Sequence, residues 1–208
     1  MQTLALVCQK GGSGKTTLAV HLAVEAATNG LRTLLMDLDP QASAARWGDR
    51  RQSGPIDVDV AVESAARLDA ALKVARQEGY DLVVLDTAPH ADQAALRVAR
   101  AADLILVPVR CSILDLDAIG TTLDLCTLAK RPSLIVINAA PIRSRVVQDA
   151  IDTLKGLGGE ICPTIIRERV AFRHAMVDGR VAREFEPDGA AAAEITALHT
   201  DTYQHANT

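Results

Sequence analysis

Eight consecutive residues near the start of the chain have the side chains and spacing to hold a phosphate group: Lys10, Gly11, Gly12, Ser13, Gly14, Lys15, Thr16 and Thr17. The glycines let backbone N–H groups converge on phosphate oxygens, and a helix after them would point its positive dipole end at the same anion. Lys15 would reach the β- and γ-phosphates, and the Thr16 hydroxyl would ligate magnesium. An apolar run precedes the segment and LAVHLAVEAA follows it. This strand, glycine loop and helix context predicts a nucleotide-binding P-loop.

Three carboxylates end or follow apolar runs, where they could serve the same phosphate. Asp37 ends the run LLMD, Asp39 lies two residues on, just before Pro40 turns the chain, and Asp86 ends the run LVVLD. Carboxylates at the carboxyl ends of parallel strands lie over the phosphate crevice, where they can contact magnesium or a water. The alternative for the first two is that Asp at a strand end caps the next helix.

Short apolar runs alternating with helical segments must position these side chains. We expect strands at residues 3–8, 33–37, 56–62, 82–86, 104–109, 134–138 and 160–165. Helices are expected at residues 15–28, 65–76, 91–101, 114–129 and 145–157, with a helical region after Glu168. This order predicts an α/β fold with a mostly parallel twisted sheet of about seven to eight strands flanked by helices, forming one domain over residues 1–208.

The composition excludes several other classes of protein. The four cysteines lie far apart with no CxxC pair, so the sequence signals neither a zinc site nor a cluster site. No apolar stretch approaches the roughly 20 residues that span a bilayer, and the N-terminus has no signal-peptide pattern. A net charge of −4 argues against a surface that binds nucleic acid everywhere, but it leaves room for a local basic patch. We expect a cytoplasmic protein with reduced thiols.

The loop departs from the usual P-loop because Gln9 replaces the first glycine and Lys10 adds a second lysine. In this it resembles the deviant Walker ATPases of the ParA/MinD family, and the resemblance covers nearly the whole chain. In that family the lysine matching Lys10 reaches the partner's phosphates in a nucleotide-sandwich dimer. The resemblance therefore implies ATP and Mg²⁺ as cofactors and an ATP-dependent homodimer. By itself, Lys10 is equally an exposed loop charge.

Further motifs carry the resemblance along the chain. The segment DLDPQ matches a switch in which Asp39 orients the attacking water and Asp37 supports the metal shell. Asp86 resembles the Walker B carboxylate that holds magnesium through a water, with His90 where a second proline is usual. Asn138, after the run LIVI, matches a residue that contacts adenine, although it would also be unremarkable as a turn residue.

Arginines after the last expected strand are the candidates for DNA binding. The segment from 165 to 187 contains the four candidates, Arg167, Arg169, Arg173 and Arg180, together with Arg183, and acidic residues interrupt them. On one side of a dimer they would hold DNA phosphates without reading bases. The alternative is an ordinary solvated helix with internal ion pairs. The C-terminal residues ITALHTDTYQHANT contain no lysine or arginine, so a basic membrane-binding helix is not expected.

These observations together predict an ATPase with weak intrinsic turnover that acts in DNA segregation. ATP would close a dimer that binds nonspecific DNA on the nucleoid, and a small centromere- or cargo-binding protein would stimulate hydrolysis. One alternative is the positioning of a protein cargo, and another is a P-loop kinase or ligase acting on a small molecule. A redox ATPase like the nitrogenase iron protein is disfavoured by the cysteine spacing.

Overall fold

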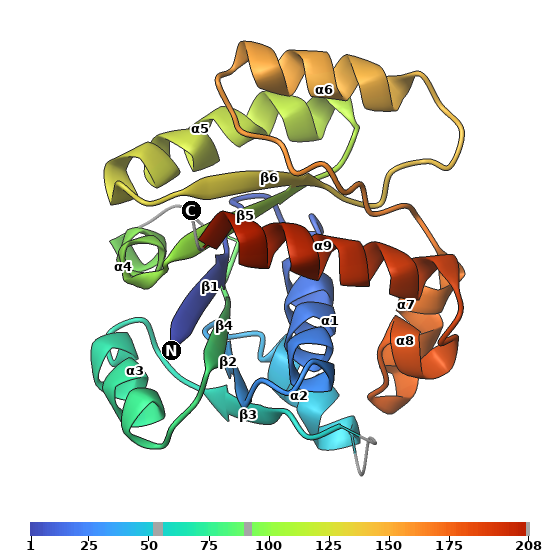
Figure 1. Cartoon of the computed structure of the whole chain (residues 1–208). Helices are drawn as coiled ribbons and strands as arrows, with labels where there is room; N and C mark the ends of the chain where they lie inside the picture. The colour runs from blue at the N-terminus through green and yellow to red at the C-terminus, as the bar shows by residue number, and fades with distance from the viewer. Residues whose placement is uncertain (52–55, 90–92, 207–208) are drawn as a thin grey trace.

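A six-stranded parallel sheet forms the centre of the molecule in the computed structural model, which describes residues 1–51, 56–89 and 93–206 (Figure 1). The strand order is β3-β2-β4-β1-β5-β6. The strands are β1 (Gln2–Leu6), β2 (Thr33–Asp37), β3 (Asp59–Val62), β4 (Leu82–Asp86), β5 (Leu104–Val109) and β6 (Ser133–Ile137). They are rich in Val, Leu and Ile, as expected for strands buried on both faces. The predicted α/β class is therefore confirmed, but the sheet has six strands and not the seven to eight that were predicted.

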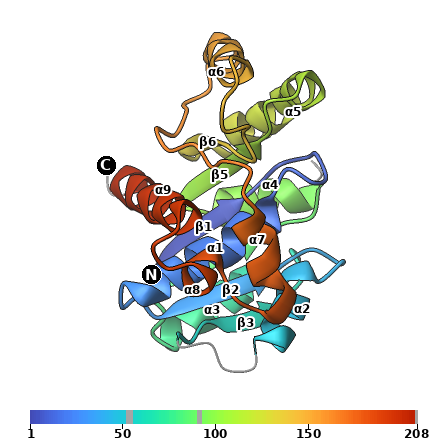
Figure 2. The same ribbon diagram turned by 90° about the vertical axis from the view of Figure 1, so that its right-hand side faces the viewer.

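Helices cover both faces of the sheet (Figures 1 and 2). One face packs against α3 (Leu68–Gln77), α4 (Gln93–Ala101), α5 (Ile113–Ala129) and α6 (Val146–Gly156). The other face packs against α1 (Lys15–Thr28), α2 (Ser43–Arg50), α7 (Val170–Ala175), α8 (Ala182–Phe185) and α9 (Ala190–Ala206), with the 3₁₀ turn η1 (Met176–Asp178) between α7 and α8. Side chains alternate between the two cores along each central strand, because successive residues of a strand point to opposite faces.

The strand order places the phosphate-binding segment at the centre of one edge of the sheet. β1 lies between β4 and β5, so the chain leaves it in one direction for β2 and in the other for β5 and β6. Ligands in such sheets bind outside the carboxyl ends of the strands at this reversal. The register brings Asp86 level with both Leu6 and Asp37, so two of the predicted carboxylates end neighbouring strands side by side.

Two local predictions were wrong. Residues 160–165 form no strand and contribute only an isolated bridge between Ile161 and Ile135. Pro163 has no N–H to donate, and Thr164 instead bonds the carboxylate of Asp201 on α9 through its N–H (3.2 Å) and hydroxyl (2.6 Å). Conversely, α2 was not predicted, because eight residues with two buried side chains give little helical periodicity.

Helix α2 is fixed to the C-terminal helices by buried polar contacts. The Arg51 guanidinium, just after α2, pairs with Glu184 on α8 at 2.6 Å, and these side chains are only 6% and 5% exposed. The indole N–H of Trp47 donates to the carbonyl of Arg180 at 3.2 Å. A side chain at Gly179 would overlap the backbone of Arg51. These contacts join the segment after Asp39 to the region that contains the predicted DNA-binding arginines.

Candidate nucleotide-binding site

The P-loop lies between β1 and α1, as the sequence predicted. Gly12 and Gly14 have φ values of 77° and 102°, a left-handed conformation that non-glycine residues rarely adopt. Lys15 is the first residue of α1, and its ammonium donates to the carbonyl of Cys8 at 3.0 Å. Burial lowers the pKa of Lys15, with Cys8, Asp86 and Asp39 opposing the shift. The loop thus holds a lysine whose own surroundings only partly satisfy its charge.

Asn138 braces this loop from the end of β6. Its amide N–H₂ donates to the carbonyl of Ser13 at 2.7 Å, and a Cβ on Gly14 would lie 2.0 Å from the same nitrogen. The glycine is therefore required both for its φ angle and for the close approach of the amide. The donor end of Asn138 is engaged with the protein, which leaves its carboxamide oxygen as the end available to a base.

Asp86 is fully buried, and neither of its carboxylate oxygens has a hydrogen-bond partner among the described residues. Burial raises the pKa of Asp86 to about 7, assisted by Asp37 and Asp39, while Thr16 and Lys15 oppose the shift. An unpartnered buried carboxylate calls for a cation or a proton. The Thr16 hydroxyl beside this carboxylate fits the family's magnesium site, in which phosphate oxygens and waters supply the other ligands.

Asp37 and Asp39 have different surroundings. Both oxygens of the buried Asp37 accept backbone N–H groups, from Asp39 at 3.0 Å and from Ala45 in the first turn of α2 at 2.9 Å. The helix-capping role considered for Asp37 is thus present in the structure. Asp39 is half-buried, and its Oδ1 accepts the N–H of Gln41 at 2.8 Å. Of these two aspartates, Asp39 is the one that lines the cavity beside the P-loop.

A cavity of about 430 Å³ opens over the P-loop, a size suited to a small-molecule ligand. It is lined by P-loop residues, Asp39, Pro89, Asn138 and residues 166–169. Phe172 and Met176 contribute apolar surface to the lining. The cavity thus combines a phosphate-binding loop with apolar side chains against which a base could pack.

Three of the four arginines proposed to bind DNA, Arg167, Arg169 and Arg173, line this cavity. The side chains of all four also make ion pairs or hydrogen bonds within the chain. Arg169 pairs with Glu194 at 2.6 Å, Arg173 with Glu168 at 3.3 Å, Arg180 with Asp178 at 2.8 Å, and Arg167 donates to the carbonyl of Pro141 at 2.9 Å. The fifth arginine of that region, Arg183, pairs with the buried Glu25 on α1 at 3.0 Å.

Lys10 is held at the rim of the loop by an ion pair. Its ammonium lies 3.0 Å from Oδ1 of Asp115 in the first turn of α5, and the two side chains are 34% and 9% exposed. The adjacent residues Ile113 and Leu114 are 72% and 69% exposed. Lys10 therefore points along the molecular surface, next to two apolar side chains that solvent covers in the single chain.

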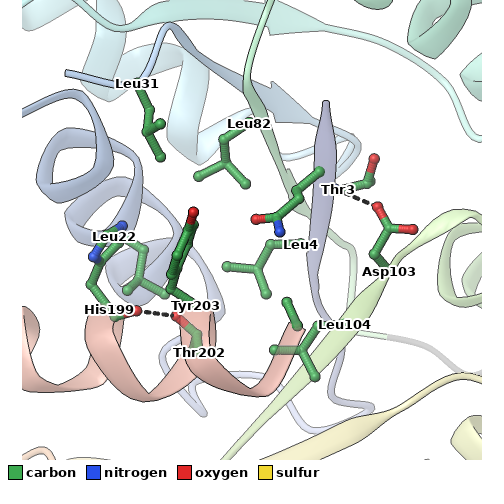
Figure 3. A pocket seen from close by; sticks show the side chains of 12 residues that line it. Thr3, Leu4, Leu22, Leu31, Leu82, Asp103, Leu104, His199, Thr202 and Tyr203 are labelled. Atoms are coloured by element: carbon green, nitrogen blue, oxygen red, sulfur yellow. Dashed lines mark hydrogen bonds between the residues drawn. The ribbon is translucent and has the colours of Figure 1, made fainter. Parts of the chain in front are cut away.

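A second hollow lies at the opposite edge of the sheet, beneath the C-terminal part of α9 (Figure 3). Five leucines line it, with Tyr203 and His199 on the α9 side. The volume is about 30 Å³, which is close to the share of one water molecule in the liquid. This hollow is too small for a nucleotide.

The comparison with known proteins agrees with this geometry. Residues 4–181 match the family model described as "CobQ/CobB/MinD/ParA nucleotide binding domain". The chain belongs to this family of nucleotide-binding proteins. The predicted resemblance to ParA/MinD ATPases is therefore confirmed, and so is the P-loop fold.

Members of the family that resemble the chain include proteins named for different roles. It is 33% identical over 200 residues to maintenance of carboxysome distribution protein A from Halothiobacillus neapolitanus, covering 92% of this chain and 91% of the relative. It is 30% identical over 222 residues to the chromosome-partitioning ATPase Soj from Thermus thermophilus, covering 90% and 89%. The structure of apo McdA from Cyanthece superposes with a TM-score of 0.81 at 18% identity, covering 97% and 99%.

Some features of the site were not predicted from the sequence. Arg110, after β5, lines the cavity, and Asp115, in the first turn of α5, pairs with Lys10. Position alone gave a weak signal, since both residues follow the carboxyl end of a central strand. His90 and residues 91 and 92, the predicted start of the helix at 91–101, lie outside the described residues.

Two absences hold for the part of the chain that the structure describes. No helix there is both long and apolar enough to cross a membrane. No group of three or more His, Cys, Asp or Glu side chains there has the arrangement of a self-contained metal site.

Proposed function

We propose that this protein is an ATP-dependent dimerising switch that positions DNA or a cargo, with slow Mg²⁺-dependent hydrolysis resetting the switch. The observation that carries the proposal is the pairing of a complete P-loop with a second lysine, Lys10, that faces away from its own loop toward Asp115. A solitary nucleotide-hydrolysing enzyme has no use for a lysine held on the surface in this way. In the family's sandwich dimer, the matching lysine reaches the partner's phosphates.

The nucleotide would bind with its phosphates on the P-loop and its base toward Asn138. Lys15 would give up its hydrogen bond to the Cys8 carbonyl and bind the β- and γ-phosphates. Their negative charge would compensate its ammonium for the solvation that is lost on burial. The carboxamide oxygen of Asn138 would accept a hydrogen bond from the adenine amino group, while the carboxamide nitrogen keeps its hydrogen bond to the Ser13 carbonyl. Adenine would then pack between the P-loop and the apolar wall at Phe172.

The carboxylates would divide the hydrolytic work. A bound magnesium ion would neutralise charge on the phosphates. Thr16 and Asp86 would hold that ion, and the cation would replace the proton that burial favours on Asp86. Asp37 would support the metal shell while its oxygens keep the first turn of α2 in place. Asp39 would orient the attacking water, because among the three strand-end carboxylates it is the one that is partly exposed and lines the cavity.

Dimerisation would require Lys10 to leave Asp115 and reach the partner's phosphates. The exposed Ile113 and Leu114 lie beside this ion pair and would be covered when a second copy approaches. Nucleotide and partner together would therefore offset the loss of the Lys10–Asp115 pair. In the single chain, that pair keeps the lysine off its own loop.

DNA binding is the output that we propose for the ATP-bound dimer. The structure favours a revised set of phosphate contacts. Arg143 and Arg145 lie exposed in the loop between β6 and α6, and within the described residues neither side chain has an ion pair or hydrogen bond. Arg167 is tied to this loop through Pro141. Arg169, Arg173 and Arg180 would first have to leave their carboxylates, so we expect them to contribute less.

Retention on nonspecific double-stranded DNA with ATP, ADP or no nucleotide tests the switch. We expect retention with ATP only, loss of retention and of nucleotide binding in Lys15→Ala, and a salt dependence typical of phosphate contacts. Asp39→Ala should still bind ATP and dimerise but hydrolyse it poorly. Equal retention in all three nucleotide states would refute the nucleotide-gated part, and normal turnover of Asp39→Ala would remove the role of Asp39.

The nature of the cargo is a second question, and the relatives offer two answers. One is named for carboxysome distribution and the other for chromosome partitioning. We propose an activator protein that binds either a centromere or a protein cargo and stimulates hydrolysis at the nucleoid in the cytoplasm. Affinity capture with the Asp39→Ala variant locked by ATP would distinguish them, because co-purification of a sequence-specific DNA-binding protein supports partition and that of a cargo assembly supports positioning.

A further inference from the structure

Arg110 is a cation of the nucleotide cavity to which the mechanism above gives no role. It is exposed, it lines the cavity together with the P-loop, and its side chain makes no hydrogen bond or ion pair with any described residue. In this it differs from Arg167, Arg169 and Arg173 in the same cavity, which are all engaged. An unpaired guanidinium facing an anion-binding loop is a ready partner for a phosphate.

Strand alternation explains why Arg110 faces the cavity. Leu104 and Leu106 of β5 pack in the core on the α1 side of the sheet, while Val107 and Val109 pack on the opposite side. The alternation continues past the end of the strand, so the side chain of Arg110 emerges on the α1 side, the side of the P-loop helix.

The neighbouring strand places Asn138 beside Arg110. The register pairs Val109 with Ile137, and the N–H of Asn138 donates to the Val109 carbonyl at 2.7 Å. Arg110 and Asn138 are thus the next residues in line and emerge on the same face. Asn138 already contacts the P-loop at Ser13, so Arg110 lies close to the loop on the β5 side.

The order of the strands decides which phosphate Arg110 faces. Asp39 follows β2 and Pro89 follows β4, both on one side of β1, whereas Arg110 and Asn138 follow β5 and β6 on the other side. A nucleotide whose γ-phosphate faces Asp39 and whose base faces Asn138 must run from one side to the other. Its α-phosphate then lies over β5.

We propose that Arg110 is a nucleotide-binding residue that contacts the α-phosphate. This proposal rests on the nucleotide orientation given above for the proposed function. Because ATP and ADP share the α-phosphate, Arg110 stabilises both nucleotides equally and does not contribute to the difference between them. Selection of the triphosphate is then left to Lys10 and to the carboxylate side of the cavity.

Equilibrium binding of the intact protein to ADP and to AMP-PNP, with magnesium present, tests this role by calorimetry. Arg110→Ala should weaken the binding of both nucleotides by a similar factor, roughly tenfold for the loss of one charge-assisted contact. Arg110→Lys should lose less, since it keeps the charge without the bidentate geometry. Arg131→Ala is the matched control, because Arg131 is exposed near the start of β6 at the opposite edge of the sheet.

Unchanged affinity of Arg110→Ala for both nucleotides would overturn the proposal. A loss confined to AMP-PNP would also overturn it, because it would put the contact at the γ-phosphate or across a dimer. Failure of the unmodified protein to bind either nucleotide would instead refute the proposed function. The first two outcomes are read from the isotherms of Arg110→Ala, and the third is read from those of the unmodified protein.

Discussion

His21 gives a prediction that links the P-loop helix to the C-terminal helices through one buried ring. Its Nδ1 lies 2.7 Å from the Thr17 carbonyl and must therefore carry the proton, while Nε2 accepts the N–H of Ala182 at 3.0 Å. The ring meets Phe172 edge-on at 5.1 Å. Protonating Nε2 would set an N–H against an N–H, so only the neutral ring satisfies both neighbours.

The pH dependence follows from this environment. Burial lowers the pKa of His21 from 6.5 to about 4, with the Thr17 carbonyl and Glu184 opposing the shift. Between these values the unfolded chain binds more protons than the folded one, so the free energy of unfolding falls as the pH falls from 6.5 toward 4. On going from pH 8 to pH 5, the titration of His21 should lower the free energy of unfolding by roughly 2 kcal/mol.

Urea unfolding from pH 8 to pH 5 checks the prediction in His21→Gln. At pH 8 the variant should be less stable by about 1 to 3 kcal/mol, because the contacts to Thr17 and Ala182 are weakened. Toward pH 5 the difference should narrow, since the variant lacks the titrating ring. His174→Gln, which changes an exposed histidine, should keep the unmodified slope. If His21→Gln also kept that slope, the neutral buried ring would be refuted.

Three further perturbations test other contacts. Asp115→Asn should release Lys10 while preserving the start of α5, and it should tighten ATP-dependent dimerisation roughly two- to fivefold in sedimentation experiments. Arg51→Met leaves Glu184 buried without its partner and should destabilise the chain by about 3 to 5 kcal/mol in urea unfolding. Gly14→Ala, which combines a φ of 102° with a Cβ overlap, should abolish nucleotide binding in calorimetry. An unaltered dimer affinity would contradict the first prediction, and an unaltered unfolding curve the second. An unaltered binding isotherm would contradict the third.

Local patterns were enough to predict most of the elements. The strands at residues 33–37, 82–86 and 104–109 and the helix at 15–28 have the predicted bounds, because apolar runs and helical periodicity are visible within a short window. The P-loop was equally clear, since its glycines and lysine are contiguous. The failures were α2, which is short and held by distant contacts, and residues 160–165, where a proline and a side-chain bond to α9 replaced strand pairing.

The sequence by itself predicted a phosphate-binding loop between β1 and α1, and it determined that carboxylates end the neighbouring strands. Only the tertiary structure decided how each charge is used. It gave Lys10 a partner 105 positions away, directed Arg110 into the cavity without one, and engaged Arg169 with Glu194. Electrostatic contacts of this kind depend on distance in space and on burial, and neither quantity is encoded in the spacing of residues along a chain.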